Sequence, residues 1–220
     1  MSSYVSYTTN TQILKDINRT FAHSKYFDKN SSSQGFNRLH RLLIALTTYR
    51  NIGYVQGLNF IAASFLWHCD EELAYYIITE LFHRVKMETL FDDKMKGVHS
   101  KSDVFFEEYL SQEAPEIYQS LNSNQIPGVM ILTEWIVTLG FVIVPIKHHM
   151  PLIKGLLESQ WSYLYRVMLR YYKVLFPVFR RLRFDEGLMM IKRAHEDDMQ
   201  MKYGYAIDWP AILKGSLQAS

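Results

Sequence analysis

The apolar residues of this chain recur at helical spacing almost from end to end, and this pattern limits the fold more than any other feature. Ile13, Ile17 and Phe21 follow one another at four-residue intervals, as one face of a helix requires. Further helical patterns cover about residues 39–46, 58–69, 71–85, 102–111, 114–123, 129–142, 150–158, 160–176 and 184–196. No run alternates with a period of two for long enough to indicate a strand. The sequence therefore predicts an all-α fold of many helices with no sheet.

The length and composition are those of a folded protein. With 220 residues, of which 48% are apolar, the chain can bury the core of one domain or of two helical lobes. We expect an N-terminal extension over residues 1–12, a helical domain over 13–200 and a C-terminal tail over 201–220. The polar segments 28–35 and 91–103 are interpreted as surface loops and not as interdomain linkers.

Charge and cysteine content exclude several classes of protein. The 24 basic and 22 acidic residues leave a formal charge of +2, which disfavours a nucleic-acid-binding protein. Cys69 is the only cysteine, so an intrachain disulfide and a thiolate metal cluster are both excluded. The N-terminus lacks the basic start and apolar run of a signal peptide. We therefore expect a cytoplasmic protein in a reducing compartment.

One apolar run is close to the length of a membrane span. Residues 128–146 contain a single charged residue, Glu134, which would cost about 2.5 to 3.5 kcal/mol near the middle of a bilayer. Gly140 weakens the run as a helix, and Pro145 closes it. We expect a buried core helix here and no transmembrane segment.

The common catalytic and metal-binding motifs are absent. The sequence contains no GxxxxGK[ST] phosphate loop, no HExxH zinc helix and no GxSxG elbow. His148 and His149 are adjacent, so they lack the spacing of helical metal ligands and are expected to be a solvated pair. The run from His195 to Asp198 could bind a cation, but it is typical of a solvated helix face. We therefore expect neither a metal nor a cofactor.

Two short segments carry the polar groups that are hardest to explain as ordinary surface. In "ILKDINRTF", Asp16 and Arg19 are three residues apart, so on a helix the carboxylate can orient the guanidinium. In "NIGYVQGLN", Gln56 stands on a turn between Gly53 and Gly57, just before another helical pattern. Taken separately, the two segments are a surface ion pair and a turn glutamine. Their occurrence together, in this order, favours a shared function.

In these segments the chain resembles the TBC domain family, whose members activate GTP hydrolysis by Rab-type small GTPases. The first signature of the family is matched by Ile13, Asp16, Arg19, Thr20 and Phe21, and the second by Tyr54, Gln56, Gly57 and Asn59. Trp135 is similar to a tryptophan that follows the middle of the family's domain. The resemblance covers about residues 11–185.

The resemblance implies a chemical role for each segment. Arg19 would be an arginine finger on the phosphate oxygens of the partner's GTP, and Gln56 would orient the attacking water. An amide suits that task because it donates and accepts hydrogen bonds without carrying charge. The supporting residues would be Asp16, Tyr54, Gly53, Gly57 and Asn59.

The resemblance also implies a partner and a cellular role. The partner would be a GTP-bound Rab, and GTP and Mg²⁺ would belong to it, so this chain would act in trans without hydrolysing nucleotide itself. We expect a role in vesicle trafficking, with peripheral recruitment to endomembranes through the Rab.

Three departures from the family keep a second hypothesis open. Only twelve residues precede Ile13, where family domains carry several more helices. The I-W-D element of the family falls on residues 152–154, so that Lys154 replaces its aspartate, and Gln160 replaces the glycine expected before Trp161. The chain is therefore either an activator or a TBC-like Rab-binding module or scaffold without activity, and it is expected to be shortened or divergent.

Overall fold

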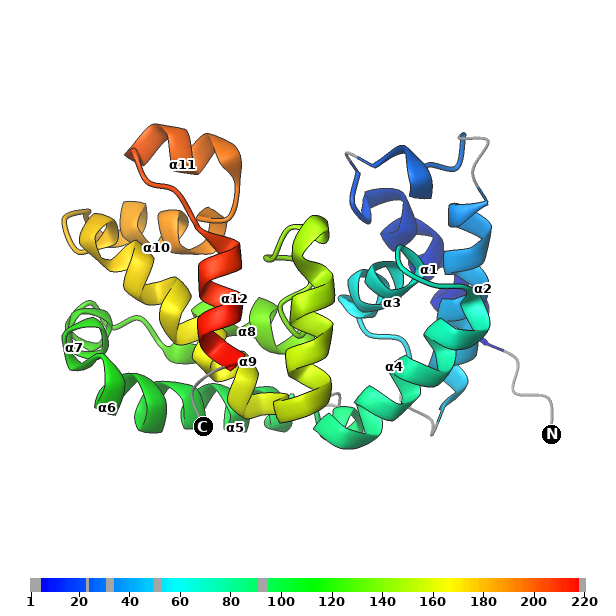
Figure 1. The fold of residues 1–220 in the computed structure, drawn as a ribbon, viewed down its shortest axis with the longest axis horizontal. Coiled ribbons are helices and arrows are strands. Elements are labelled where there is room, and N and C mark those ends of the chain that lie inside the picture. The colour runs from blue at the N-terminus through cyan, green and yellow to red at the C-terminus, as the bar shows by residue number, and fades with distance from the viewer. Residues whose placement is uncertain (1–4, 23, 31–33, 50–52, 91–94, 218–220) are drawn as a thin grey trace. The chain divides into compact units, whose positions relative to one another are not determined.

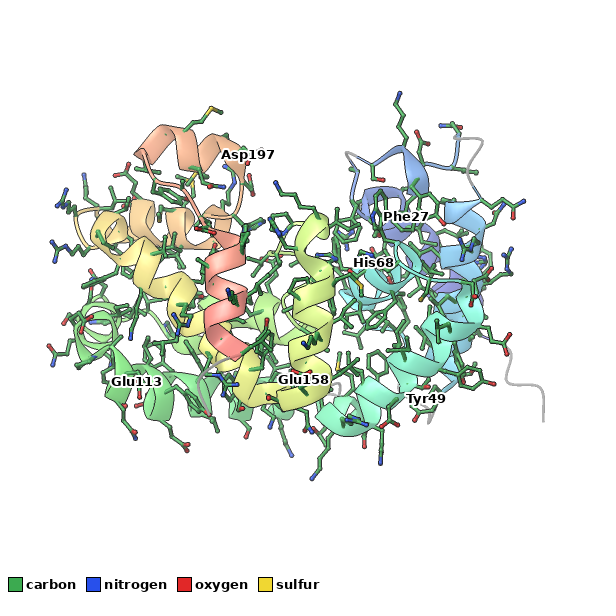
Figure 2. The ribbon with its side chains drawn as sticks, in the orientation of Figure 1. Phe27, Tyr49, His68, Glu113, Glu158 and Asp197 are labelled. Atoms are coloured by element: carbon green, nitrogen blue, oxygen red, sulfur yellow. The ribbon has the colours of Figure 1, made fainter. Side chains whose placement is uncertain are left out.

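The computed structural model describes residues 5–22, 24–30, 34–49, 53–90 and 95–217. Within these ranges the chain forms helices and turns and no strand, which confirms the predicted all-α fold (Figure 1). The chain divides into two compact units, Met1–Lys94 and Met95–Ser220. In each unit apolar side chains fill the spaces between helices, whereas many long charged side chains extend outward (Figure 2).

The first unit is built around two strongly buried helices. Its elements are α1 (Tyr7–Arg19), the 3₁₀ turn η1 (Lys25–Phe27), α2 (Gly35–Thr48), α3 (Leu58–Leu66), α4 (Glu71–Val85) and the 3₁₀ turn η3 (Met87–Thr89). The leucine stripe of α2 is buried, and eight of the nine residues of α3 are buried as well. Helices α1, α2 and α4 all contact α3. The largely apolar sequence of α3 therefore reflects its central place in this unit.

Helix α4 has the same bounds as the predicted pattern 71–85, because both of its ends carry favourable charges. Asp70 precedes it and accepts a hydrogen bond from the Leu73 amide at 2.9 Å. Glu71 and Glu72 occupy the first turn, and His83 and Arg84 the last, as the helix dipole favours. The chain leaves the helix through Lys86, which has a left-handed backbone.

The second unit contains one long helix and several short ones. Its elements are α5 (Lys96–Asp103), the π-helix η4 (Val104–Leu110), α6 (Ser111–Glu113), α7 (Pro115–Ser123), α8 (Gly128–Val137), the 3₁₀ turn η5 (Ile146–His148), α9 (His149–Phe179), α10 (Phe184–Arg193), α11 (Asp197–Tyr203) and α12 (Trp209–Leu217). Helix α12 packs along α9. The rings of Trp209 and Tyr171 are stacked, with their centroids 5.6 Å apart. The segment expected to be a C-terminal tail therefore holds a helix with a buried tryptophan.

The interpretation of residues 91–103 as a surface loop was wrong for its described part. Lys96–Asp103 is helix α5, and two of its residues, Val98 and Ser102, are buried. Residues 91–94 lie outside the described part. The buried face of α5 is difficult to recognise in its short, polar sequence, because it consists only of Val98 and Ser102, which are four residues apart. The division between the two units also falls inside this segment, between Lys94 and Met95, although its sequence does not resemble an interdomain linker.

The apolar run at residues 128–146 is a short buried helix followed by turns. Helix α8 ends at Val137, because Leu139 and Gly140 adopt left-handed backbones with φ of 51° and 83°. The Gly140 amide donates to the Trp135 carbonyl at 2.9 Å, closing the helix end. In the part of the chain that the structure describes, no helix combines the length and apolar character needed to cross a membrane.

Helix α9 bends sharply at Gln160, the position where the resemblance to the TBC family leads us to expect glycine. Gln160 has φ of 50° and ψ of −129°, the conformation of the first central residue of a type II′ turn, where glycine dominates. The bend brings the Tyr163 ring over Gly155, where an added Cβ would lie 2.2 Å from the ring. The substitution at this position therefore leaves a side chain on a backbone that favours glycine.

We predict that Gln160→Gly stabilises the protein. A left-handed backbone costs an ordinary residue about 1 to 2 kcal/mol, and the extra freedom of glycine in the unfolded chain cancels about 0.5 to 1 kcal/mol of that gain. The expected net increase is about 1 kcal/mol, or about 3 °C in the midpoint of thermal unfolding followed by circular dichroism. Gln119→Gly, on the exposed face of α7, is the matched control and should lower stability by about 1 kcal/mol. A lower midpoint for Gln160→Gly would contradict the strain.

Candidate functional site

The carboxylate of Asp16 lies at the centre of the candidate site. Helix α1 buries Ile13 and Ile17 on the face that also carries Asp16, which is 1% exposed. One turn later, at the end of the helix, the Arg19 side chain is 51% exposed. The Arg19 Nη2 atom lies 2.7 Å from Asp16 Oδ1. The carboxylate thus holds one edge of the guanidinium while the rest of that side chain reaches solvent.

The buried charge of Asp16 is satisfied by two further donors. The Tyr54 hydroxyl donates to Oδ2 at 2.7 Å, and the Gln12 amide donates to Oδ1 at 3.0 Å. A buried carboxylate needs such partners, because an unpaired one would be strongly destabilising. Burial raises the pKa of the Tyr54 hydroxyl well above its usual value, and the bond to Asp16 raises it further. Tyr54 therefore stays protonated and remains a donor across the neutral range.

Gln56 lies at the tip of a tight turn that enters α3. The Leu58 amide donates to the Val55 carbonyl at 3.1 Å, which closes the turn, and Gln56 is exposed. Gly57 has φ of 115°, and Gly53 has φ of 73°, so both positions favour glycine. At Gly53 an added Cβ would meet no atom within 4 Å, so the backbone angle and not space explains this glycine. Residues 51 and 52 of the motif lie outside the described part.

A second link joins this turn to α1. The Gly57 amide donates to Asn59 Oδ1 at 3.0 Å, and Asn59 Nδ2 donates to Thr20 Oγ1 at 2.8 Å. Thr20 in turn donates to the Asp16 carbonyl at 2.7 Å. Asn59 is fully buried, and Thr20 is 2% exposed. The links Tyr54–Asp16 and Asn59–Thr20 therefore hold the chain on both sides of Gln56 against the helix that carries Arg19.

Thr20 belongs to the first signature, but nothing in its local sequence assigns it a place in the site. Its partner Asn59 is 39 residues away, and only the packing of α1 on α3 brings them together. The available signal was a small hydroxyl residue directly after Arg19. The next residue, Phe21, also departs from the helical pattern, since its φ is 46°. The centroid of its ring lies 6.3 Å from that of Phe27 and 5.4 Å from that of Phe60, and these contacts fix the end of α1.

The two segments with possible metal ligands make contacts within the chain. His149 is buried, and its Nε2 atom lies 2.7 Å from the Val144 carbonyl oxygen, so the expectation of a solvated histidine pair was wrong for this residue. Two acids of the run from His195 to Asp198, Glu196 and Asp198, form ion pairs with Arg193, which precedes the run. Asp197, labelled in Figure 2, begins α11. No group of three candidate metal-binding side chains occurs among the described residues.

The structure is that of an all-α domain in which an exposed arginine and an exposed glutamine lie on one buried network. Comparison with known proteins identifies its family. The Rab-GTPase-TBC domain model matches residues 2–177, and the chain belongs to this family. The match begins before Ile13, within the segment predicted to be an N-terminal extension.

Curated relatives share the family but differ in length. TBC1 domain family member 14 of Rattus norvegicus is 27% identical over 186 residues, which are 83% of this chain and 26% of that protein. Rab GTPase-activating protein tbc-11 of Caenorhabditis elegans is 30% identical over 130 residues, 58% of this chain and 14% of that protein. The chain thus spans about a quarter of the length of the TBC1 relative.

Two solved structures share the fold. The crystal structure of the Ypt/Rab-GAP domain of Gyp1p has a TM-score of 0.76 and 15% identity, and the match covers 98% of this chain and 74% of that one. The crystal structure of the Chlamydomonas flagellar RabGAP TBC domain has a TM-score of 0.72 and 20% identity. This match covers 98% of this chain and 68% of that one.

We predict that Tyr54→Phe destabilises the first unit, because it removes a donor from the buried Asp16 carboxylate. The expected loss is about 2 kcal/mol in the free energy of unfolding, measured by urea denaturation. Tyr118→Phe is the control, since the Tyr118 hydroxyl donates to an exposed carboxylate, that of Glu107. It should change stability by less than about 0.5 kcal/mol. Equal effects of the two substitutions would contradict the importance of the Tyr54–Asp16 bond.

Proposed function

We propose that this chain stimulates GTP hydrolysis by a Rab-type small GTPase, supplying Arg19 and Gln56 in trans. The observation that carries the proposal is the pair of links from α1 to the Gln56 turn, which hold two exposed polar side chains on one buried network. Membership of the Rab-GTPase-TBC family supports the same function. So does the likeness to tbc-11, which is named a Rab GTPase-activating protein.

Arg19 has the chemistry that phosphoryl transfer requires. In the transition state, negative charge develops on the phosphate oxygens, and a planar guanidinium can donate to two of them at once. Asp16 already uses one edge of that group, so the other donors are oriented before the partner arrives. Such preorganisation is effective because little rearrangement remains to be made during the reaction.

Gln56 has the chemistry needed to position water. Its amide can accept a hydrogen bond from a water molecule and donate one to a neighbouring oxygen, and it stays neutral throughout. Tyr54 and Asn59 anchor the backbone on either side of Gln56, so the amide extends from a short turn whose position is fixed. In the proposal, Gln56 orients the attacking water, which a glutamine of the GTPase orients when no activator is bound.

The proposal includes a cellular setting and leaves the chain without a cofactor of its own. GTP and Mg²⁺ belong to the partner, which binds in its GTP-loaded form. Recruitment to endomembranes follows from the location of the Rab, and the process served is vesicle trafficking.

The alternative function is Rab binding without stimulation of hydrolysis. The observation that favours it is the loss of family residues in α9, where Lys154 replaces an aspartate. Lys154 is exposed, and its Nζ atom lies 3.9 Å from Glu158 Oε1. Neither residue belongs to the network around Asp16, so this departure leaves the arrangement of Arg19 and Gln56 unaltered. Single-turnover hydrolysis by a panel of Rab proteins, with and without the chain, separates the two functions.

We predict that Arg19→Ala and Arg19→Lys each lower the stimulated hydrolysis rate about 10³-fold, since only a guanidinium presents the planar fork. Affinity for the GTP-loaded partner should change far less. The measurement is single-turnover hydrolysis together with a binding assay. Lys15→Ala, on the exposed side of α1, is the control and should retain full activity. Retention of most activity by Arg19→Lys would show that the fork geometry is not required.

We predict unequal effects of two glutamine substitutions. Gln56→Ala should remove most of the stimulation, at a cost of about 3 to 4 kcal/mol in the activation free energy. Replacing the water-positioning glutamine of the partner Rab should leave much of the stimulated rate intact. Gln119→Ala, at an exposed glutamine of α7, serves as the control. If the partner's glutamine proved essential and Gln56→Ala were silent, the turn would have only a structural role.

A further inference from the structure

The sequence from Gln160 to Phe184 contains six basic residues and no acidic one, although the rest of the chain has more acids than bases. The six are Arg166, Arg170, Lys173, Arg180, Arg181 and Arg183. They occupy the second half of α9 and the turn that joins α9 to α10 (Figure 1). This stretch therefore concentrates positive charge within a nearly neutral chain.

The first two of these residues are used inside the fold. Arg166 Nε donates to the Ser216 carbonyl at 2.7 Å. Arg170 lies over Gly215 of α12, where an added Cβ would be 2.8 Å from the guanidinium carbon. The remaining four, Lys173, Arg180, Arg181 and Arg183, are all exposed, and we refer to them as the basic end of α9. Lys173 and Arg180 are seven residues apart, so they share one helix face.

No residue of the basic end of α9 makes an ion pair within the part of the chain that the structure describes. Other exposed arginines do: Arg41 pairs with Glu71, and Arg84 pairs with Glu80. The two acids that follow the cluster have other surroundings. Glu186 accepts from the Tyr203 hydroxyl at 2.9 Å, and Asp185 lies in the first turn of α10, where the helix dipole favours it.

Apolar groups accompany these charges at the surface. Phe184, directly after Arg183, is 47% exposed, and Pro177 is exposed between Lys173 and Arg180. Basic side chains beside an exposed aromatic ring are typical of segments that rest on a lipid bilayer, with the bases on the headgroups and the ring at the acyl boundary.

We propose that the basic end of α9, with Phe184 at its edge, binds the surface of a membrane containing anionic phospholipids. The charges match such a surface, and clustered bases on a helix end are suited to it. A fluid surface requires no fixed side-chain geometry. Among the described residues no ion pair holds these side chains, in contrast to Arg19, and only Arg180 has a ring contact, with Phe176 at 5.6 Å from the ring centroid. The cavity beside Arg180, Arg183 and Phe184 is only about 30 Å³, which is too small for a segment of a protein partner.

The test is co-sedimentation of the whole chain with phosphatidylcholine vesicles and with vesicles that also contain phosphatidylserine. We expect binding to the phosphatidylserine vesicles that weakens as the NaCl concentration rises. The triple variant Arg180→Gln, Arg181→Gln, Arg183→Gln should lower the partition coefficient about a hundredfold. Phe184→Ser should lower it several-fold.

The matched control is the triple variant Arg41→Gln, Arg84→Gln, Arg193→Gln, which removes the same charge from arginines that have acidic partners. It should bind the vesicles nearly as well as the original chain. Thermal unfolding of both triple variants shows whether they fold. Equal loss in the two variants, equal binding to vesicles without phosphatidylserine, or binding of RNA or an acidic protein in place of vesicles would each overturn the proposal. The outcome does not depend on GTP hydrolysis.

Discussion

The arrangement of the candidate site depends on the burial of one carboxylate, that of Asp16. An ionised group with 1% exposure is tolerated only when its oxygens are paired, and here Arg19, Tyr54 and Gln12 supply the donors. Two of these donors lie on α1 itself, and the third comes from the loop before α3. The need to satisfy one buried charge thus joins the helix that carries the exposed arginine to Tyr54, which lies 38 residues after Asp16.

The Asn59–Thr20 link makes this connection rigid. A single hydrogen bond at Tyr54 would leave the following turn free to pivot, but Asn59 anchors its far side through Thr20 and the Gly57 amide. Every polar atom in this second link is buried, where a broken hydrogen bond is costly. Gln56 is exposed on a strongly constrained backbone, which is the combination that a group positioned for a partner requires.

Arg19 and the arginines of the basic end of α9 illustrate two different uses of the same side chain. Arg19 is held by an acid and sits on a network that fixes its direction. The arginines at the end of α9 have no acidic partner in the described part of the chain and lie exposed beside Phe184. Fixed geometry suits a reaction centre, whereas clustered charge without ion pairs suits a diffuse anionic surface.

The sequence by itself determined the all-α class, the bounds of α4 and the positions of Asp16, Arg19 and Gln56 on their segments, because helical periodicity, end charges and short motifs are local properties. The tertiary structure alone decided that Thr20 meets Asn59 and that His149 is buried, because these depend on contacts between elements distant in the chain. It also decided that residues 96–103 form a helix with a buried face. The bend at Gln160 belongs to the same group: a glutamine carries no local signal for a left-handed backbone, and packing of Tyr163 on Gly155 accompanies it.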